Sequence, residues 1–318
     1  MTRKIVVPLD RSPVAESALP FAVSLARDLG AELALVSVID LPLEFAAWLD
    51  ATTVIDQKID VEDAYEDYLE AVAAEIDDVP VETAVRMGGA ASEIEEYVNS
   101  FDDPILVMAS HGRSGVRRLI IGSVTQQVVH RVKVPVIVVP ARIPVDEDKP
   151  VGPVESILIP LDGSEFSEYA LHKVLELLGD RRPAIHLMRV VEVVSWYGGP
   201  YSGMDLYGLD PYIDAATDAA TEYLDKLAEQ LTERGFPVTT EVRVGLVADQ
   251  IDAVADSRKV DLVVMATHGR SGVGRLIFGS VAERALRQTV VPLMLVRPGP
   301  EVSESADDLT EAIVSLRA

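Results

Sequence analysis

The sequence predicts two α/β domains, each built on a doubly wound, parallel, five-stranded sheet with helices on both faces. Three observations lead to this prediction. The chain contains an internal repeat, short β-rich runs alternate with helical stretches in both copies, and some β-rich runs are apolar at every residue, as at Ile105–Met108 and Val136–Val139. Such runs are typical of parallel strands that helices cover on both faces.

The internal repeat is clearest in the heptapeptide SHGRSGV at 110–116, which returns as THGRSGV at 267–273, 157 residues later. Near the front of each copy, VPLDRS at 7–12 returns as IPLDGS at 159–164, with an offset of 152. A repeat of this period in a chain of 318 residues indicates two copies of one domain, each long enough to bury its own core.

Each copy is expected to alternate strands and helices, which favours a flavodoxin-like sheet with its ligand beyond the carboxyl ends of the strands. In the first copy we expect strands at 3–8, 32–39, 80–86, 104–109 and 135–140, and helices at 13–29, 57–77, 90–99 and 123–131. In the second copy we expect strands at 155–160, 184–191, 237–244, 261–266 and 291–296.

The domain boundaries follow from the ends of the repeat. We expect a first domain at 1–142, a proline-bearing acidic linker at 143–153 and a second domain at 154–298. The remaining tail at 299–318 carries apolar residues at roughly helical spacing.

The composition limits the classes of partner. With 52 acidic against 28 basic residues, the formal charge is −24, which repels nucleic acid and anionic membranes. The absence of cysteine excludes disulfides and thiolate metal sites, and no apolar run reaches the roughly 18 residues of a membrane span. We therefore expect a cytoplasmic protein without nucleic-acid or membrane partners.

A candidate phosphate site follows the fourth strand of each copy. In the first copy the loop carries Gly112, Gly115 and Gly122, whose missing side chains let backbone N–H groups approach an anion. Ser123 is expected at the N-cap of the next helix, where the helix dipole also favours an anion. Arg113 adds a guanidinium that could contact phosphate or lie in solvent. The second copy repeats this arrangement with Gly269, Arg270, Gly272, Gly279 and Ser280.

An alternative explains the end of this motif without a ligand. Ser123 with Gln126, and Ser280 with Glu283, fit the capping-box pattern, which satisfies a helix N-terminus by itself. A cap does not require the glycine-rich beginning of the loop, which recurs at the same spacing. The spacing therefore favours the phosphate site.

The loops, with the Pro-x-Asp after each first strand, resemble the universal stress protein family over nearly the whole chain. The resemblance implies a HUP-type strand order of 3-2-1-4-5, ATP binding, and dimerisation that a tandem chain can satisfy internally. If Mg²⁺ accompanies ATP, the carboxylates of Asp10 and Asp162 could serve as ligands, because hard cations take oxygen ligands. Ala109 and Ala266 stand where the family pattern has its first glycine, so a methyl group narrows each site. The expected nucleotide-binding residues are Pro8, Asp10, Val38, Met108, Ala109, Gly112, Arg113, Gly115, Gly122, Ser123, Val124, Thr125, Pro160, Asp162, Val190, Met265, Ala266, Gly269, Arg270, Gly272, Gly279, Ser280 and Val281.

The leading hypothesis for function is a nucleotide-linked regulator in the stress response. Thr125 is expected to add a hydroxyl to the phosphates, and its counterpart Ala282 is not. We expect no catalytic residue, since His111 and His268 lack a nucleophile partner in sequence, and no metal site from Asp10 or Asp162 alone. The alternatives are a slow ATPase or nucleotide-dependent transferase, and a scaffold acting through domain pairing or a homodimer.

Overall fold

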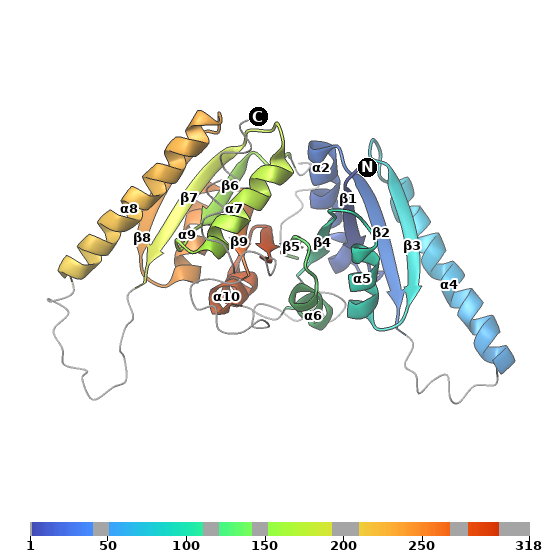
Figure 1. Cartoon of the computed structure of the whole chain (residues 1–318). Coiled ribbons are helices and arrows are strands. Elements are labelled where there is room, and N and C mark those ends of the chain that lie inside the picture. The colour runs from blue at the N-terminus through green and yellow to red at the C-terminus, as the bar shows by residue number, and fades with distance from the viewer. Residues whose placement is uncertain are drawn as a thin grey trace, which may run out of the picture. The chain divides into compact units, whose positions relative to one another are not determined.

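The structure is a computed structural model that describes residues 2–40, 51–110, 121–141, 152–192, 210–267 and 279–298 (Figure 1). For residues 51–60 and 210 the backbone alone is described. The chain divides into two compact units. Unit 1 holds Met1–Val154 with Pro292–Leu295, and unit 2 holds Glu155–Val291 with Val296–Ala318. The predicted tail at 299–318 lies outside the described residues, as does most of the predicted linker.

The first repeat alternates strands and helices as the sequence predicts. Its elements are β1 (Lys4–Pro8), α1 (Pro13–Glu16), α2 (Leu19–Leu29), β2 (Glu32–Ile39), α4 (Ala51–Ala74), β3 (Val81–Met87), α5 (Ala90–Asn99), β4 (Ile105–Ala109), α6 (Ser123–Arg131) and β5 (Val136–Val139).

The second repeat has the same order of elements. They are β6 (Ser156–Pro160), α7 (Glu165–Leu178), β7 (Ala184–Val191), α8 (Asp210–Glu233), β8 (Val238–Val244), α9 (Val247–Arg258), β9 (Leu262–Ala266), α10 (Ser280–Gln288) and β10 (Leu293–Val296).

The predicted fold class and strand order are confirmed. The order is β3-β2-β1-β4-β5 in the first repeat and β8-β7-β6-β9-β10 in the second. Neighbouring strands are parallel, for example β1 with β2 and with β4, and β6 with β7 and with β9. Every residue of β4, β5, β9 and β10 is buried, because helices cover both faces of a doubly wound sheet. One pair departs from the parallel pattern, since Leu293–Leu295 run antiparallel to Val136–Val138 within unit 1.

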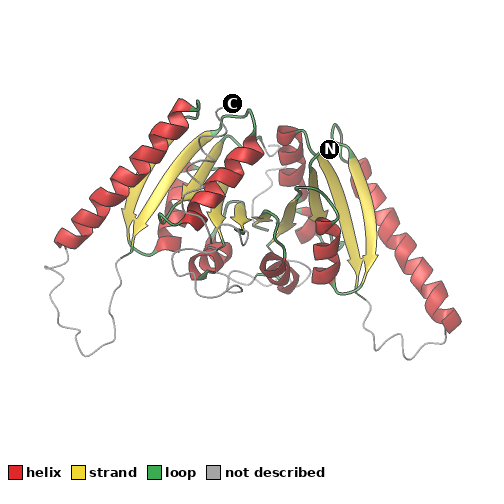
Figure 2. Cartoon of the chain, viewed as in Figure 1, coloured by secondary structure: helices red, strands yellow, loops and turns green. Residues whose placement is uncertain are grey.

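Helices lie on both faces of the strands in each unit (Figure 2). In unit 1, α4 lies beside α1, and α5 packs against α6. Right-handed crossovers place these two helix pairs on opposite faces, because the chain moves from β1 outward to β3 and then returns to β4 and β5. The reversal lies between β1 and β4, and it leaves a crevice at the carboxyl ends of these strands.

One predicted helix is wrong in detail. The single helix expected at 13–29 is divided into α1 and α2. Pro20 in the first turn of α2 explains the break, because its ring has no N–H and clashes with a carbonyl four residues earlier in a continuous helix. The second repeat has His172 at the equivalent position, and α7 runs unbroken.

Candidate functional site

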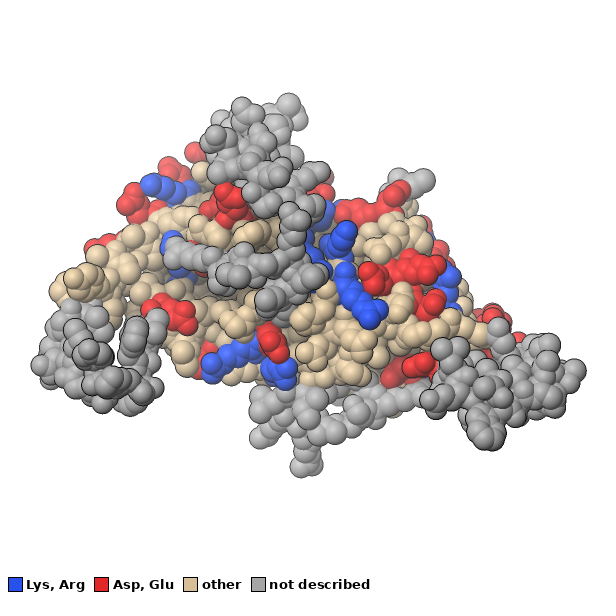
Figure 3. Space-filling view, turned by 60° about the horizontal axis from the view of Figure 1, so that its bottom comes forward, with Lys and Arg blue, Asp and Glu red and all other residues tan. Residues whose placement is uncertain are grey.

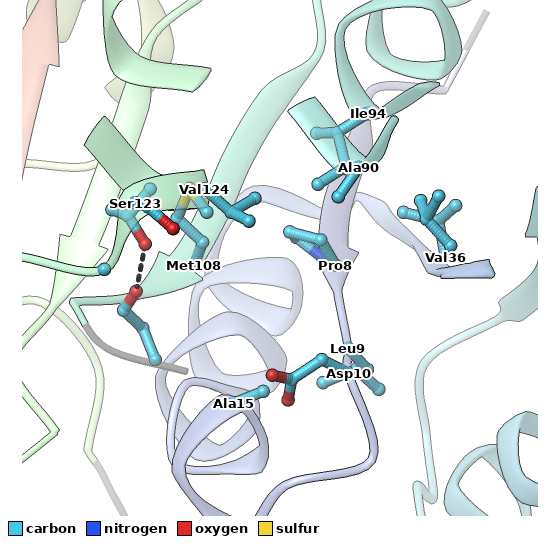
Figure 4. Close-up of a pocket in the computed structure, with 14 residues that line it drawn as sticks. Pro8, Leu9, Asp10, Ala15, Val36, Ala90, Ile94, Met108, Ser123 and Val124 are labelled. Atoms are coloured by element: carbon cyan, nitrogen blue, oxygen red, sulfur yellow. Dashed lines mark hydrogen bonds between the residues drawn. The ribbon is translucent and has the colours of Figure 1, made fainter. Parts of the chain in front are cut away.

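The first repeat contains a pocket of about 310 Å³ at the carboxyl ends of β1 and β4 (Figure 4). This first pocket lies at the switch point of the sheet, where the fold class predicts a ligand site. Helix α5 contributes Ala90 and Ile94 to its wall, and β2 contributes Val36. Every described residue that the sequence assigned to this site lines the pocket: Pro8, Asp10, Val38, Met108, Ala109, Gly122, Ser123, Val124 and Thr125.

Asp10 organises the loop at one end of the first pocket. Its Oδ1 accepts hydrogen bonds from the backbone N–H of Ser12 at 3.1 Å and from the Ser12 hydroxyl at 2.5 Å. The Ser12 Oγ in turn accepts from the N–H of Ala15 at 3.1 Å and caps α1. Asp10 therefore shapes the turn between β1 and α1, and its side chain also faces the pocket.

The N-terminus of α6 forms the other end of the first pocket, and here the sequence prediction needs correction. Gly122, not Ser123, is the N-cap residue, and no side-chain hydrogen bond caps the helix. The predicted capping box with Gln126 is therefore wrong, and the N–H of Gln126 bonds to the Gly122 carbonyl as in any helix. Within the described residues, the first-turn N–H groups have neither an intrahelical acceptor nor a cap, which favours an anionic ligand there.

Thr125 is buried and lies in the first turn of α6. Its hydroxyl donates a 3.1 Å hydrogen bond to the carbonyl of Ala109 at the end of β4, the bond drawn dashed in Figure 4. The hydroxyl hydrogen therefore joins α6 to β4 in this structure and does not face an incoming phosphate. In the second repeat the equivalent Ala282 is also buried but has no hydroxyl to donate such a bond.

The second repeat contains an equivalent pocket of about 600 Å³ at the carboxyl ends of β6 and β9. We call it the second pocket. Its lining also includes two charged residues, Arg189 near the end of β7 and Glu192 directly after that strand. Again every described residue that the sequence assigned lines the pocket: Pro160, Asp162, Val190, Met265, Ala266, Gly279, Ser280 and Val281.

The second pocket repeats both ends of the first. Asp162 Oδ1 accepts from the N–H of Ser164 at 2.9 Å and from its hydroxyl at 2.5 Å, and Ser164 caps α7. Gly279 is the N-cap residue of α10, again with no side-chain cap, so Ser280 begins the helix and the second predicted capping box is also wrong. Glu283 instead pairs with Arg287 at 2.8 Å.

The glycine-rich part of each loop falls outside the described residues. These predicted site residues are Gly112, Arg113, Gly115, Gly269, Arg270 and Gly272.

A tyrosine–glutamate pair beside each pocket escaped the sequence prediction. Tyr68 of α4 donates to Glu16 of α1, and Tyr223 of α8 donates to Glu168 of α7, both at 2.8 Å. Burial, followed by the hydrogen bond to glutamate, raises the pKa of both phenols. The available signal in the sequence was the repeat: Glu168 follows Glu16 by 152 residues, and Tyr223 follows Tyr68 by 155. No motif around these residues indicates that the tyrosine contacts the glutamate.

The described surface offers little else that resembles a binding site. On the face shown in Figure 3, acidic and basic side chains of the described residues are interspersed. Among the residues that the structure describes, no three His, Cys, Asp or Glu side chains gather as metal ligands. No helix in the described ranges is both long and apolar enough to cross a membrane. The two pockets are therefore the strongest candidate sites in the described residues.

Comparisons with known proteins agree with the fold and the repeat. The sequence profile of the universal stress protein family matches residues 1–140 and again residues 153–297. Universal stress protein MJ0531 of Methanocaldococcus jannaschii is 29% identical over 143 residues, which cover 45% of this chain and 82% of that protein. A universal stress protein of Mycolicibacterium smegmatis is 25% identical over 302 residues, 92% of this chain and 97% of its own length.

A solved structure supports the same architecture across both repeats. The crystal structure of a universal stress protein from Archaeoglobus fulgidus superposes with a TM-score of 0.68 at 21% identity, covering 93% of this chain and 98% of the other. The two matches to the family profile span most of both repeats. This chain therefore belongs to the universal stress protein family, as a tandem member with one family domain in each repeat.

Proposed function

We propose that the chain binds ATP or a related adenine nucleotide in its pockets and acts in the stress response as a nucleotide-linked regulator. The observation that carries the proposal is a duplicated arrangement. Each repeat has one pocket at the switch point of the sheet. One end of the pocket is a helix N-terminus without a side-chain cap, that of α6 or α10, and the other end is the turn held by Asp10 or Asp162.

The two ends of the first pocket suit the two ends of a nucleotide. The N–H groups at the start of α6 suit phosphate oxygens, because a helix N-terminus carries a partial positive charge. The apolar wall of Val36, Ile94 and Met108 suits a purine ring, and the end of β2 at Val38 brings backbone groups close to it. Asp10 stands at the same pocket, and we propose that it faces the ribose or base.

We propose binding as the primary activity and hydrolysis as the alternative. Among the described residues that line the two pockets there is no histidine or lysine to act as a general base. Asp10, Asp162 and Glu192 are the acidic side chains in the described lining, and Asp10 and Asp162 each hold their own loop. A Mg²⁺ ion would therefore depend on phosphate oxygens for most of its ligands.

The experiment is a calorimetric titration of the full chain with ATP, supported by native mass spectrometry. We expect two equivalents at saturation. Gly122→Val should remove the first-pocket equivalent and Gly279→Val the second, because each adds a branched side chain at the start of the helix. Both glycines have extended backbone, with φ of −56° and −64°, which valine adopts without strain.

Each single variant serves as the control for the other, because Gly122→Val leaves the second pocket unchanged and Gly279→Val leaves the first pocket unchanged. The double variant should bind no ATP and unfold in urea at the concentration of the unsubstituted chain. No binding by the unsubstituted chain, or unchanged stoichiometry in the double variant, would overturn the proposal. Release of ADP during the titration would favour the ATPase alternative.

Two further proposals go with this role. We propose the cytoplasm as the compartment, since a chain without cysteine needs no oxidising environment for folding. We also propose that the two repeats pair within the chain, with a homodimer as the alternative. Sedimentation of the purified chain distinguishes these, because pairing within the chain gives a mass of 34.4 kDa.

A further inference from the structure

The two repeats differ in charge at one pair of equivalent positions on the second strand of each, beside the pockets. In the first repeat this position is Ser37, which is fully buried and donates a 2.7 Å hydrogen bond to the carbonyl of Leu9. In the second repeat it is Arg189, which is half-buried and lines the second pocket. The described lining of the first pocket includes no guanidinium.

Two contacts define the position of the Arg189 guanidinium beside the second pocket. It lies over the ring of Tyr223, 5.0 Å from the centroid, where the aromatic face attracts a cation. It also lies against Gly163, at which a Cβ would be only 3.2 Å from the Nη1 atom. Gly163 has a φ of +78°, so glycine both adopts the turn without strain and leaves room for the arginine.

The first repeat exchanges these residues. Arg11 occupies the position of Gly163, with a φ of +63°, and its guanidinium lies 5.0 Å from the ring of Tyr65. Each repeat thus has one arginine near this turn, but it comes from the loop in the first repeat and from the strand in the second. Among the described residues, only the arginine on the strand lines its pocket.

Arg189 lies far from the end of the pocket that suits phosphate. It is on β7, two strands from β9, which leads to the N-terminus of α10. At about 4.8 Å between neighbouring strands, this separation is about 10 Å. The Arg189 guanidinium lies against Gly163 in the loop that holds Asp162, at the end of the pocket opposite the N-terminus of α10, and is therefore placed for the base end of a nucleotide. Glu192, on the same segment, adds an exposed carboxylate to the lining.

We infer that the second pocket binds guanine nucleotides more tightly than adenine nucleotides, whereas the first pocket has the reverse preference; this rests on the proposed nucleotide binding. A guanidinium donates only, and it suits the O6 and N7 acceptors of guanine in a bidentate contact. A carboxylate accepts only, and it suits the N1–H and N2–H groups of guanine. Adenine has an N6 amino group where guanine has O6. This amino group donates hydrogen bonds, so it would face the N–H donors of the Arg189 guanidinium without an acceptor between them.

The test measures ATP and GTP binding with one pocket open at a time. Gly122→Val leaves the second pocket open, and Gly279→Val leaves the first. By calorimetry we expect GTP to bind the open second pocket at least about 10-fold more tightly than ATP, and the open first pocket to show the reverse order.

Substitutions at the arginine then identify the cause. In the Gly122→Val background, Arg189→Ser introduces the residue of the first repeat and should weaken GTP binding about 10- to 100-fold without weakening ATP binding. Arg189→Lys keeps the charge without the planar fork, so it should not restore the preference. Glu192→Gln, an exposed change that should leave folding intact, should also weaken GTP more than ATP.

Several results would overturn the inference. One is a second pocket that binds ATP as tightly as GTP, and another is an equal loss of both nucleotides in Arg189→Ser. If Arg189→Ser fails to fold, the Glu192→Gln comparison decides, and equal affinities there also overturn it. If neither nucleotide binds the unsubstituted chain, the proposed function itself fails. ATP binding without any GTP preference contradicts this inference alone.

Discussion

The phenol of Tyr223 donates a 2.8 Å hydrogen bond to Glu168 and so joins α8 to α7 beside the second pocket. Tyr68 makes the same bond to Glu16 in the first repeat. Each pair connects the helix after the second strand with the helix that follows the aspartate turn. In the second repeat α8 contributes Ala216 to the pocket lining, so the bond there connects a helix of the pocket wall to the helix that Ser164 caps.

Replacing both tyrosines by phenylalanine should lower the free energy of unfolding by about 1 kcal/mol at each site, because each change leaves a glutamate without its phenol donor. Urea unfolding at pH 7 measures the loss. As a control, Tyr212→Phe alters an exposed tyrosine and should have no effect. Equal stability of the double variant and the unsubstituted chain would contradict the role of these bonds.

The same tyrosines should make stability fall at alkaline pH. Their pKa values are raised in the folded chain, so their contribution is present below the ordinary value of about 10 and is lost as the pH rises above it. We expect urea midpoints to fall between about pH 9 and pH 11. The double phenylalanine variant should show a shallower decline, and an identical decline would contradict the assignment.

Thr125→Ala should affect stability more than nucleotide binding. The hydroxyl of Thr125 bonds to the carbonyl of Ala109, so its loss should cost about 1 kcal/mol of unfolding free energy. ATP affinity of the first pocket should change less than about threefold, because the hydroxyl hydrogen does not face the ligand. A tenfold or greater loss of affinity would restore the sequence hypothesis of a phosphate contact. Ala282→Thr offers the reciprocal change in the second repeat.

Asp10 and Asp162 should be needed for their turns as well as for the pockets. Asp10→Ala removes the acceptor of two hydrogen bonds from Ser12 and should cost about 1 to 2 kcal/mol. Asp10→Asn keeps an acceptor oxygen and should cost less. If the asparagine variant keeps its stability but loses ATP affinity, the negative charge acts on the ligand. Equal destabilisation by both substitutions would contradict a turn held by an acceptor oxygen alone.

His186 should make the second unit less stable in acid. Its ring lies between the hydroxyls of Thr239 at 2.6 Å and Ser156 at 3.1 Å, and burial lowers its pKa. A lowered pKa means that its contribution is present above about 6.5 and is lost as the pH falls through the folded value. His186→Asn should therefore flatten the change in unfolding free energy between pH 7.5 and pH 5.5. An unchanged slope would show that another group titrates.

Many residues that line the two candidate pockets could be predicted from the sequence, because they lie at strand ends. The apolar runs fix where the strands stop, and Asp10, Asp162, Gly122 and Gly279 follow those ends in sequence. The carboxyl ends of parallel strands meet at one edge, so these residues converge without further information. Positions that interrupt a helix by local chemistry, such as Pro20, were also open to prediction, although the sequence interpretation missed that break.

The sequence by itself determined the duplication, the fold class and the two loop ends of each site, because periodicity and turn chemistry are local properties of the chain. Only the tertiary structure decided which side chains contact across elements. It showed that Gly122, and not Ser123, is the N-cap residue of α6, and that the hydroxyl of Thr125 donates a hydrogen bond to the carbonyl of Ala109. It also placed Arg189 against Gly163, a contact between residues 26 apart whose geometry depends on strand pairing and side-chain direction.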